Sequence, residues 1–193
     1  MAGMQLKDGW FSGEGIRRMD SPNCDSRPFS CTDTAGSVSL LVIHNISLPP
    51  GEFGGCYVDQ LFTNCLNPND HVFFESIANI KVSAHLFIGR RGDVTQYVSL
   101  KDRAWHAGKS VFQGKESCND FSIGIELEGT DDQPYTDVQY RRLAEITRYI
   151  MLAYPEIKTE NIVGHCDISP DRKTDPGASF DWKQYRRLIA AGV

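Results

Sequence analysis

The sequence predicts a single α/β domain in which a mixed central β-sheet is flanked by α-helices. Short apolar runs, typical of strands, are interspersed with long amphipathic segments that are typical of helices. The Arg-Arg-Gly-Asp turn at 90–93 lies between two strand-like runs and indicates a hairpin, so the sheet is not purely parallel. The 193 residues, 40% of them hydrophobic, are enough for one core and short for two.

The first half of the chain contains one clear strand and one long insertion. Residues 1–36 are rich in Gly, Ser, Asp and Pro, and we expect them to wrap the surface as extended chain and loops. Residues 37–44 are predicted to form a strand with a continuous apolar run at 40–43, which indicates a central position with burial on both faces. Residues 46–80 form an insertion that we expect to border the functional site and to move on glycine hinges. Its predicted short helix buries Val58, Leu61, Phe62 and Cys65.

The second half alternates strands with two longer helices. Strands are predicted at 82–89, 94–98, 121–128 and 162–164. A capping box, Thr136-x-x-Gln139, opens a helix that closes at Tyr154 because proline follows. A last helix is predicted over 180–191, with an inward face formed by Trp182, Tyr185 and Ile189.

Composition excludes several classes of partner. The formal net charge of −5 argues against nucleic acid, because phosphate binding needs a basic excess. The longest apolar run, Tyr149–Tyr154, is far shorter than the roughly 20 residues of a membrane span. No apolar segment follows the N-terminus, so we expect a cytoplasmic protein whose six cysteines are reduced.

Two histidines and one aspartate are the candidate metal ligands. His44 and His165 each follow a short apolar strand, where side chains reach a sheet edge. Asp175 comes ten positions after His165, just before a Pro-Gly turn. Such a set leaves a fourth tetrahedral position for water, which is the arrangement of catalytic zinc.

Structural roles for the same residues remain open at this stage. Asp175 is also a suitable turn residue, and Asp167 and Asp171 are suitable loop caps. Cys166 is a possible competing ligand, but the neighbour of His165 in an extended strand points the other way.

Four long motifs show a resemblance to a known family. They are Val-Ile-His-Asn-Ile-Ser-Leu-Pro-Pro-Gly-Glu-Phe-Gly at 42–54, Asp-Arg-Ala-Trp-His-Ala-Gly at 102–108, the stretch 118–130 around Ile-Glu-Leu-Glu, and 164–177. Together they resemble the type 2 N-acetylmuramoyl-L-alanine amidases, a superfamily that includes peptidoglycan-recognition proteins. Within it they are similar to the branch of cytoplasmic 1,6-anhydro-N-acetylmuramyl-L-alanine amidases of Gram-negative bacteria. The resemblance runs from about Gly9 to Trp182.

The resemblance implies a role for each site residue. The family's ligands to one zinc ion fall on His44, His165 and Asp175. Its catalytic glutamate falls on Glu126 and its catalytic lysine on Lys173. Strand alternation alone does not choose between Glu126 and Glu128, which share one face of their strand.

Expected substrate contacts are Asn45, Lys81, Trp105, His106 and Asn119. Trp105 and His106 could form a wall of the cleft or pack in the core, and Asn119 could shape the cleft or cap a turn. Lys81 matches a family arginine near a substrate carboxylate. Ser117 stands where relatives carry another arginine, so carboxylate recognition is expected to shift to Lys115 or to weaken.

The implied function is hydrolysis of the amide bond between the lactyl group of anhydro-N-acetylmuramic acid and L-alanine. We expect a monomer acting on small soluble muropeptides in cell-wall recycling, with no nucleic-acid or membrane partner. By family analogy, loss of this activity favours β-lactamase induction. The alternatives are a non-catalytic peptidoglycan-binding module and an amidase of intact peptidoglycan.

Overall fold

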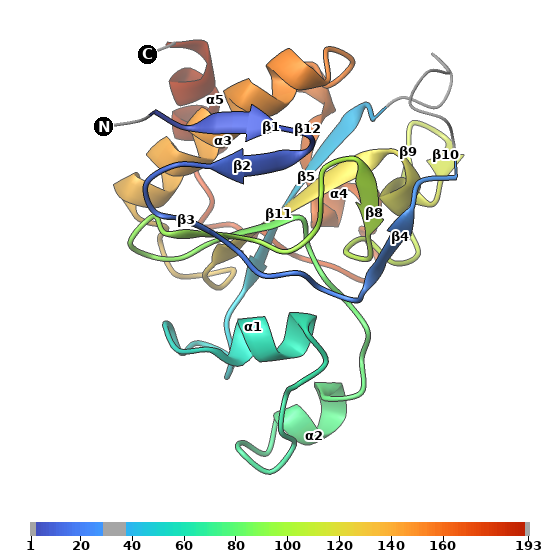
Figure 1. The fold of residues 1–193 in the computed structure, drawn as a ribbon, viewed down its shortest axis with the longest axis vertical. Coiled ribbons are helices and arrows are strands. Elements are labelled where there is room, and N and C mark those ends of the chain that lie inside the picture. Colours follow the sequence, from blue (N-terminus) through green and yellow to red (C-terminus); the bar gives the residue numbers. More distant parts are fainter. Residues whose placement is uncertain (1–2, 29–37, 192–193) are drawn as a thin grey trace.

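A six-stranded mixed sheet forms the centre of the computed structural model, which describes residues 3–28 and 38–191 (Figure 1). The strand order is β12-β5-β11-β6-β7-β3. Strands β12 (Ile162–Gly164), β5 (Leu40–Ile46), β11 (Ser122–Glu128) and β6 (Leu86–Ile88) are parallel. The hairpin partner β7 (Val94–Gln96) runs antiparallel to β6. The predicted fold class is therefore confirmed.

The central strand β5 shows why the apolar run is continuous. Leu41 and Ile43 face one side of the sheet and Leu40 and Val42 the other, and all four side chains are inaccessible to solvent. The strand continues two residues past His44, because β11 pairs with it as far as Ile46. The prediction placed the strand end at His44 itself.

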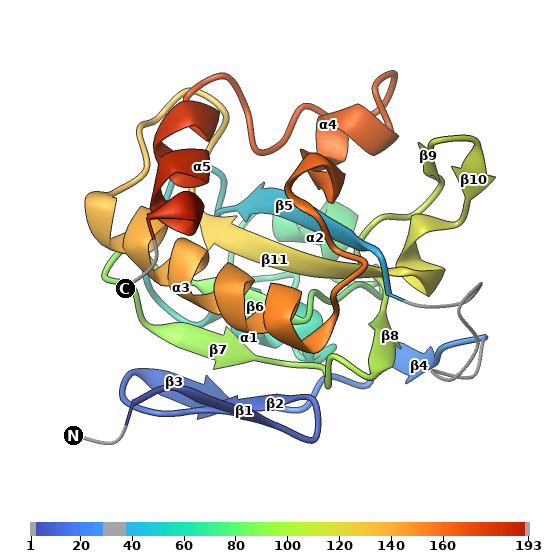
Figure 2. The same ribbon diagram turned by 90° about the horizontal axis from the view of Figure 1, so that it is seen from above.

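Two helices cover one face of the sheet. In Figure 2, α3 (Asp137–Ala153) and α5 (Trp182–Ala190) lie side by side along it. The capping box at Thr136 and Gln139 is formed, and the helix ends before Tyr154, as predicted. Helix α5 begins two residues later than predicted, because the Asp181 carboxylate caps it by accepting a hydrogen bond from the Gln184 N–H. Tyr185 of α5 faces inward and is fully buried.

The N-terminal segment does more than wrap the surface. Strands β1 (Gln5–Lys7) and β2 (Trp10–Ser12) form a hairpin, and β3 (Ile16–Arg18) completes the main sheet beside β7. Strand β4 (Cys24–Ser26) pairs with β8 (Asp102–Ala104). The described part of the predicted segment thus contains four short strands that the sequence did not indicate individually. Residues 29–36 of the predicted segment lie outside the described residues.

The insertion forms a separate protrusion at one end of the molecule, seen at the bottom of Figure 1. It contains α1 (Tyr57–Phe62) and α2 (Phe74–Ile77). Val58, Leu61 and Phe62 are buried as predicted, in one cluster with Phe87 of β6 and with Tyr97, which follows β7. Cys65 was expected to join them, but α1 ends at Phe62 and leaves Cys65 exposed. Helix α2 has only four residues and was not predicted.

Several short elements complete the chain. Strands β9 (Val111–Phe112) and β10 (Lys115–Glu116) form a small hairpin ahead of the 3-10 turn at Cys118–Asp120, and a second such turn spans Thr159–Asn161. The predicted strand 82–89 is reduced to β6. The Ser83 N–H donates to the carbonyl oxygen of Trp105, and the Tyr97 N–H donates to that of His85, so the backbone before Leu86 is bonded outside the regular β6–β7 ladder. The five described cysteines are all free, and no helix in the described ranges is long and apolar enough to cross a membrane.

Glu128 fastens the insertion to the end of β11. Its buried carboxylate accepts hydrogen bonds from the backbone N–H of Gly54 and, at 2.9 Å, from that of Arg90. Because hydrogen bonds to a buried charge contribute about 1.5–3 kcal/mol, we expect Glu128→Ala to lower the free energy of unfolding by about 2 kcal/mol. Chemical denaturation of the variant measures this. Glu128→Gln, which keeps one acceptor, is the matched control, and equal stability of all three proteins would contradict the anchoring role.

Candidate metal centre

The register of the parallel strands places three functional side chains in one row. Glu126 on β11 pairs with His44 on β5, and Gly164 at the end of β12 pairs with Ile43. His165 follows Gly164 and begins the short helix α4 (His165–Ile168). Carboxyl ends of parallel strands are the usual position of ligand sites in open α/β sheets, and the row lies at this edge.

A loop carries Asp175 back to the same row. The Cys166 N–H donates to the Asp175 carbonyl oxygen at 3.0 Å, and the Asp167 carboxylate accepts from the Gly164 N–H at 2.7 Å. Any side chain at Gly164 would meet this loop, since a Cβ there would lie 2.7 Å from Cδ of Pro176. Asp167 thus caps the start of α4, the structural role considered for it from the sequence.

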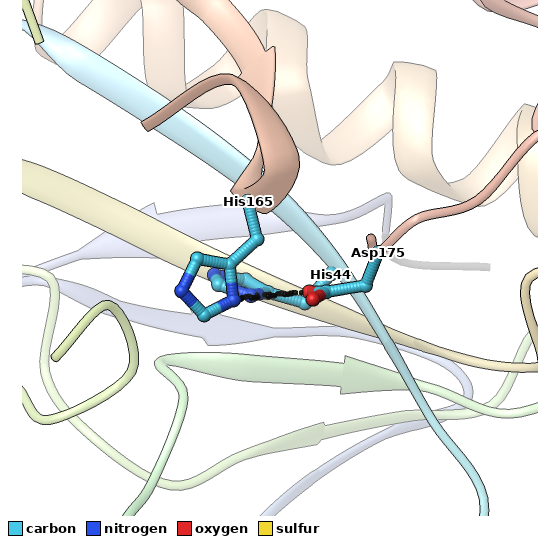
Figure 3. Close-up of side chains that lie close together, drawn as sticks. All are labelled: His44, His165 and Asp175. Carbon is cyan, nitrogen blue, oxygen red and sulfur yellow. Dashed lines mark hydrogen bonds and ion pairs between the residues drawn. The ribbon is translucent and has the colours of Figure 1, made fainter. Parts of the chain in front are cut away.

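Three potential ligand atoms converge in the position that the sequence predicted (Figure 3). His44 Nδ1 lies 3.0 Å from His165 Nδ1 and 2.9 Å from Asp175 Oδ2, and the third side of the triangle is 3.1 Å. Both histidines are buried, and the Asp175 side chain is only 13% exposed. No other group of three such side chains is found in the part of the chain that the structure describes.

This triangle fits a tetrahedral cation site. His165 Nε2 lies 3.1 Å from the carbonyl oxygen of Ala107, which can only accept, so Nε2 carries the proton and Nδ1 offers a lone pair. Burial lowers the pKa of His44 to about 4, so this ring is also neutral near pH 7. Zinc bonds of about 2.0–2.1 Å in tetrahedral geometry separate neighbouring ligand atoms by about 3.3 Å. The observed triangle is close to that size.

Glu126, not Glu128, is the carboxylate that is available beside the triangle. Glu128 is occupied by two backbone N–H groups, whereas Oε2 of Glu126 is buried and has no hydrogen-bond partner among the described residues. Burial and the nearby Asp175 carboxylate raise the pKa of Glu126 well above its ordinary value, and Lys173 opposes them. Of the two carboxylates that strand alternation left open, Glu126 is thus the one without a hydrogen-bond partner for its buried oxygen among the described residues.

The raised pKa makes Glu126 a destabilising residue in the metal-free protein. A carboxylate whose pKa is raised by folding contributes stability below its unfolded pKa of about 4.3, and this stability is lost as the pH rises through the folded-state pKa. We expect Glu126→Gln to melt a few degrees higher than the metal-free wild type at about pH 8, and at the same temperature near pH 4. Thermal melts across pH check this, and a gap that widens toward acid would contradict it.

The row opens into a cleft of about 830 Å³, within the usual range for small-molecule sites. Lys173 lines it two residues before Asp175. Asn45 also lines it and donates a hydrogen bond to Asp131 at 2.8 Å. The insertion supplies an apolar wall, formed by Pro50, Leu61, Phe62, Phe73, Ile77 and Ile80. Residues of the insertion thus border this cleft.

Three expected substrate contacts lie outside the lining of this cleft. Lys81 is exposed between two lining residues, Ile80 and Val82. The indole N–H of Trp105 lies 3.2 Å from the Asp25 carboxylate, and Asn119 Oδ1 accepts from the backbone of His106 and Ala107. Asn119 therefore has the turn-capping role that was left open for it.

The position that departs from the family pattern is exposed. Ser117 has a positive φ of 61° at the start of the 3-10 turn. Nearby Lys115 places its ammonium group over the ring of Phe121, 4.1 Å from the centroid. Neither residue lines the cleft.

One residue that holds the site together was not singled out from the sequence. Arg172 donates from Nη2 to the carbonyl oxygens of Ala107 and Lys109, at 2.7 and 3.0 Å. It therefore ties the loop that bears Asp175 to the loop after His106. Its place inside the Asp-Arg-Lys-Thr-Asp motif was the available signal.

Comparison with known proteins agrees with this geometry. A sequence model of the family described as N-acetylmuramoyl-L-alanine amidase matches residues 34–178. The 1,6-anhydro-N-acetylmuramyl-L-alanine amidase AmpD of Escherichia coli K12 is 56% identical over 187 residues, 97% of this chain and 98% of that protein. A crystal structure of a selenomethionine AmpD derivative superposes with a TM-score of 0.89 at 54% identity, covering 96% and 99% of the two chains.

A more distant structure contains a ligand. It is a complex of the amidase AmiD from E. coli with the substrate anhydro-N-acetylmuramic acid-L-Ala-D-γ-Glu-L-Lys. It is 27% identical, with a TM-score of 0.59, and covers 96% of this chain and 65% of that one.

Fold, site and matched family model together define the class of protein, an amidase hydrolase. The chain belongs to the N-acetylmuramoyl-L-alanine amidase family and, within it, to the group of AmpD relatives.

Proposed function

We propose that this amidase uses one zinc ion, held by His44, His165 and Asp175, to hydrolyse the bond between the lactyl carbonyl of 1,6-anhydro-N-acetylmuramic acid and L-alanine. One observation carries the proposal. Three ligand atoms within 3.1 Å of one another face the same cleft as a buried, unpartnered Glu126 oxygen. The names of the relatives supply the substrate: AmpD proteins are described as 1,6-anhydro-N-acetylmuramyl-L-alanine amidases.

The proposed site meets two chemical requirements of amide hydrolysis. An amide is a poor electrophile, and its leaving group is an amine that must be protonated. A bound zinc ion lowers the pKa of water to about 7 and polarises a carbonyl oxygen. His44, His165 and Asp175 leave the cleft side of the triangle open for this purpose.

Glu126 is proposed to act as general base and then as general acid. Its Oε2 accepts the proton of the water molecule that attacks the lactyl carbonyl carbon. A carboxyl group with a raised pKa holds this proton long enough to pass it to the alanine nitrogen as the C–N bond breaks. One residue thereby serves as base and then as acid, and leaves the cycle ionised again.

Lys173 is a cation that lines the cleft, two residues before the Asp175 ligand. We place its ammonium group near the carbonyl oxygen, which becomes negative as the water adds. Asn45, held by Asp131, is placed to hydrogen-bond the peptide portion. Of the other predicted substrate contacts, His106 lines the cleft. Lys81 and Trp105 are proposed to contact parts of the substrate that extend beyond the cleft lining, and Asn119 acts through the backbone of His106 and Ala107.

The site bears on one of the two alternatives, and the other is left to the digests described below. A non-catalytic binding module would need neither a complete ligand set nor a poised carboxylate, and this chain has both. An amidase of intact peptidoglycan would need access for a polymer. Cytoplasmic action on small muropeptides during cell-wall recycling, by a monomer, is the role that we propose, with β-lactamase induction as its indirect consequence.

Mass spectrometry of two parallel digests tests the proposal. A soluble anhydromuropeptide should be converted into an anhydro sugar and a free peptide that begins with L-alanine. Intact sacculi should release peptide far more slowly at the same enzyme concentration. Equal or faster release from sacculi would favour the wall amidase, and binding of the muropeptide without any cleavage would favour the recognition module.

A further inference from the structure

His106 is bonded through both ring nitrogens inside the site. Its Nδ1 lies 2.9 Å from Nε2 of His44, the nitrogen on the far side of that ring from Asp175. Its Nε2 lies 3.1 Å from Oγ of Ser122. We infer that His106 is a positioning residue that fixes the tautomer and orientation of His44, so that Nδ1 of His44 presents its lone pair to the metal.

The tautomers follow from the contacts. A neutral imidazole has one N–H and one lone pair, so a ligating Nδ1 requires the proton of His44 on Nε2. That proton needs an acceptor, and Nδ1 of His106 is the atom within reach. Nδ1 of His106 is then the acceptor, its own proton is on Nε2, and this N–H donates to Ser122. His44, His106 and Ser122 thus form one directional chain.

The backbone beneath His106 is shaped for its ring. Ser122, Gly124 and Glu126 alternate along β11 and face the site. A Cβ at Gly124 would lie 2.5 Å from Cγ and Nδ1 of His106. The absence of a side chain there lets the ring approach β11 closely while it contacts His44 and Ser122. Strand β11 thus provides space for the His106 ring at Gly124, its hydrogen-bond partner Ser122, and Glu126.

The consequence is a contribution to metal affinity, in addition to the substrate contact proposed for His106. Partners that hold the second nitrogen of a ligating histidine are generally worth about 10–100-fold in metal affinity. Without His106, His44 is free to place its proton on Nδ1, where it competes with the metal. The inference rests on the proposed metal site, so the test must separate the two.

Zinc dissociation constants, measured on the metal-free full chain by competition with a chromophoric chelator, provide that test. Asparagine places its amide group near the position of Nδ1, and glutamine places it near Nε2. We expect His106→Asn to stay within a few-fold of wild type, and His106→Gln and His106→Ala to bind zinc about 10–100-fold more weakly. Unfolding free energies of the same metal-free proteins provide the control for packing.

Two results would overturn the inference. One is equal zinc affinity in His106→Asn and His106→Gln, and the other is a loss of affinity that follows the unfolding free energy instead of the acceptor position. Failure of the wild type to bind zinc would refute the metal site itself, a distinct outcome.

A second variant covers the case in which the His106 variants do not fold. Gly124→Ala keeps every ring nitrogen but adds a methyl group where the ring lies. We expect a loss of zinc affinity of about 10–100-fold in this variant. Unchanged affinity in Gly124→Ala would contradict the role of His106.

Discussion

Asp175→Ala is expected to lose zinc and activity together. The carboxylate supplies one corner of the triangle, at 2.9 and 3.1 Å from the two histidine nitrogens, and it is the negative charge of the set. Since a partner outside the coordination shell is worth about 10–100-fold in affinity, loss of a ligand should weaken zinc binding by more than about 100-fold. Metal analysis after dialysis, together with the rate of muropeptide cleavage, measures both effects.

Asp171→Ala is the matched control for this substitution. Asp171 is an exposed acid of the same loop, four residues away. Its variant should retain full zinc content and turnover. If Asp175→Ala kept stoichiometric zinc, the ligand assignment would be wrong, and Cys166 beside His165 would be the next candidate.

Glu126→Gln is expected to separate metal binding from catalysis. The substitution preserves size and leaves the three ligand atoms in place, so zinc content should not change. It removes the only proposed proton carrier, and general acid–base catalysis contributes about 10²–10⁴-fold. We expect a fall in kcat of that size with KM little changed, measured by the release of free peptide.

The pH dependence gives this prediction a second readout. In the wild type, activity should fall as the pH drops through the pKa of Glu126, because a protonated base cannot accept a proton. The residual activity of Glu126→Gln should lack this acidic limb. Full activity of the variant, or an unchanged acidic limb, would remove Glu126 from the mechanism.

The core of the fold was predictable because its signals are local. The unbroken apolar run before His44 specifies a strand covered on both faces, and the capping box specifies where α3 begins. Hydrophobic periodicity is strong in such elements. Three-residue strands such as β3 have no periodicity, and β3 forms only because β7 offers it a partner edge. Helix α2 is likewise too short to show a pattern.

The site, like the fold, was predictable from the sequence only in part. Strand ends and residue types indicated His44, His165 and Asp175, and the structure brings their ligand atoms together. The choice between Glu126 and Glu128 depends on which backbone N–H groups fold back onto each carboxylate. That information lies in the Gly54 and Arg90 loops, far along the chain. The two bonded ring nitrogens of His106 are equally invisible in the sequence.

The most direct test of the account removes and restores the metal while products are followed by mass spectrometry. The chelated, dialysed protein is mixed with a soluble anhydromuropeptide and titrated with zinc. We predict no anhydro sugar or free peptide before zinc is added, and activity that rises linearly to a plateau at one zinc per chain. Cleavage at the original rate in the metal-free protein would contradict a zinc centre at His44, His165 and Asp175.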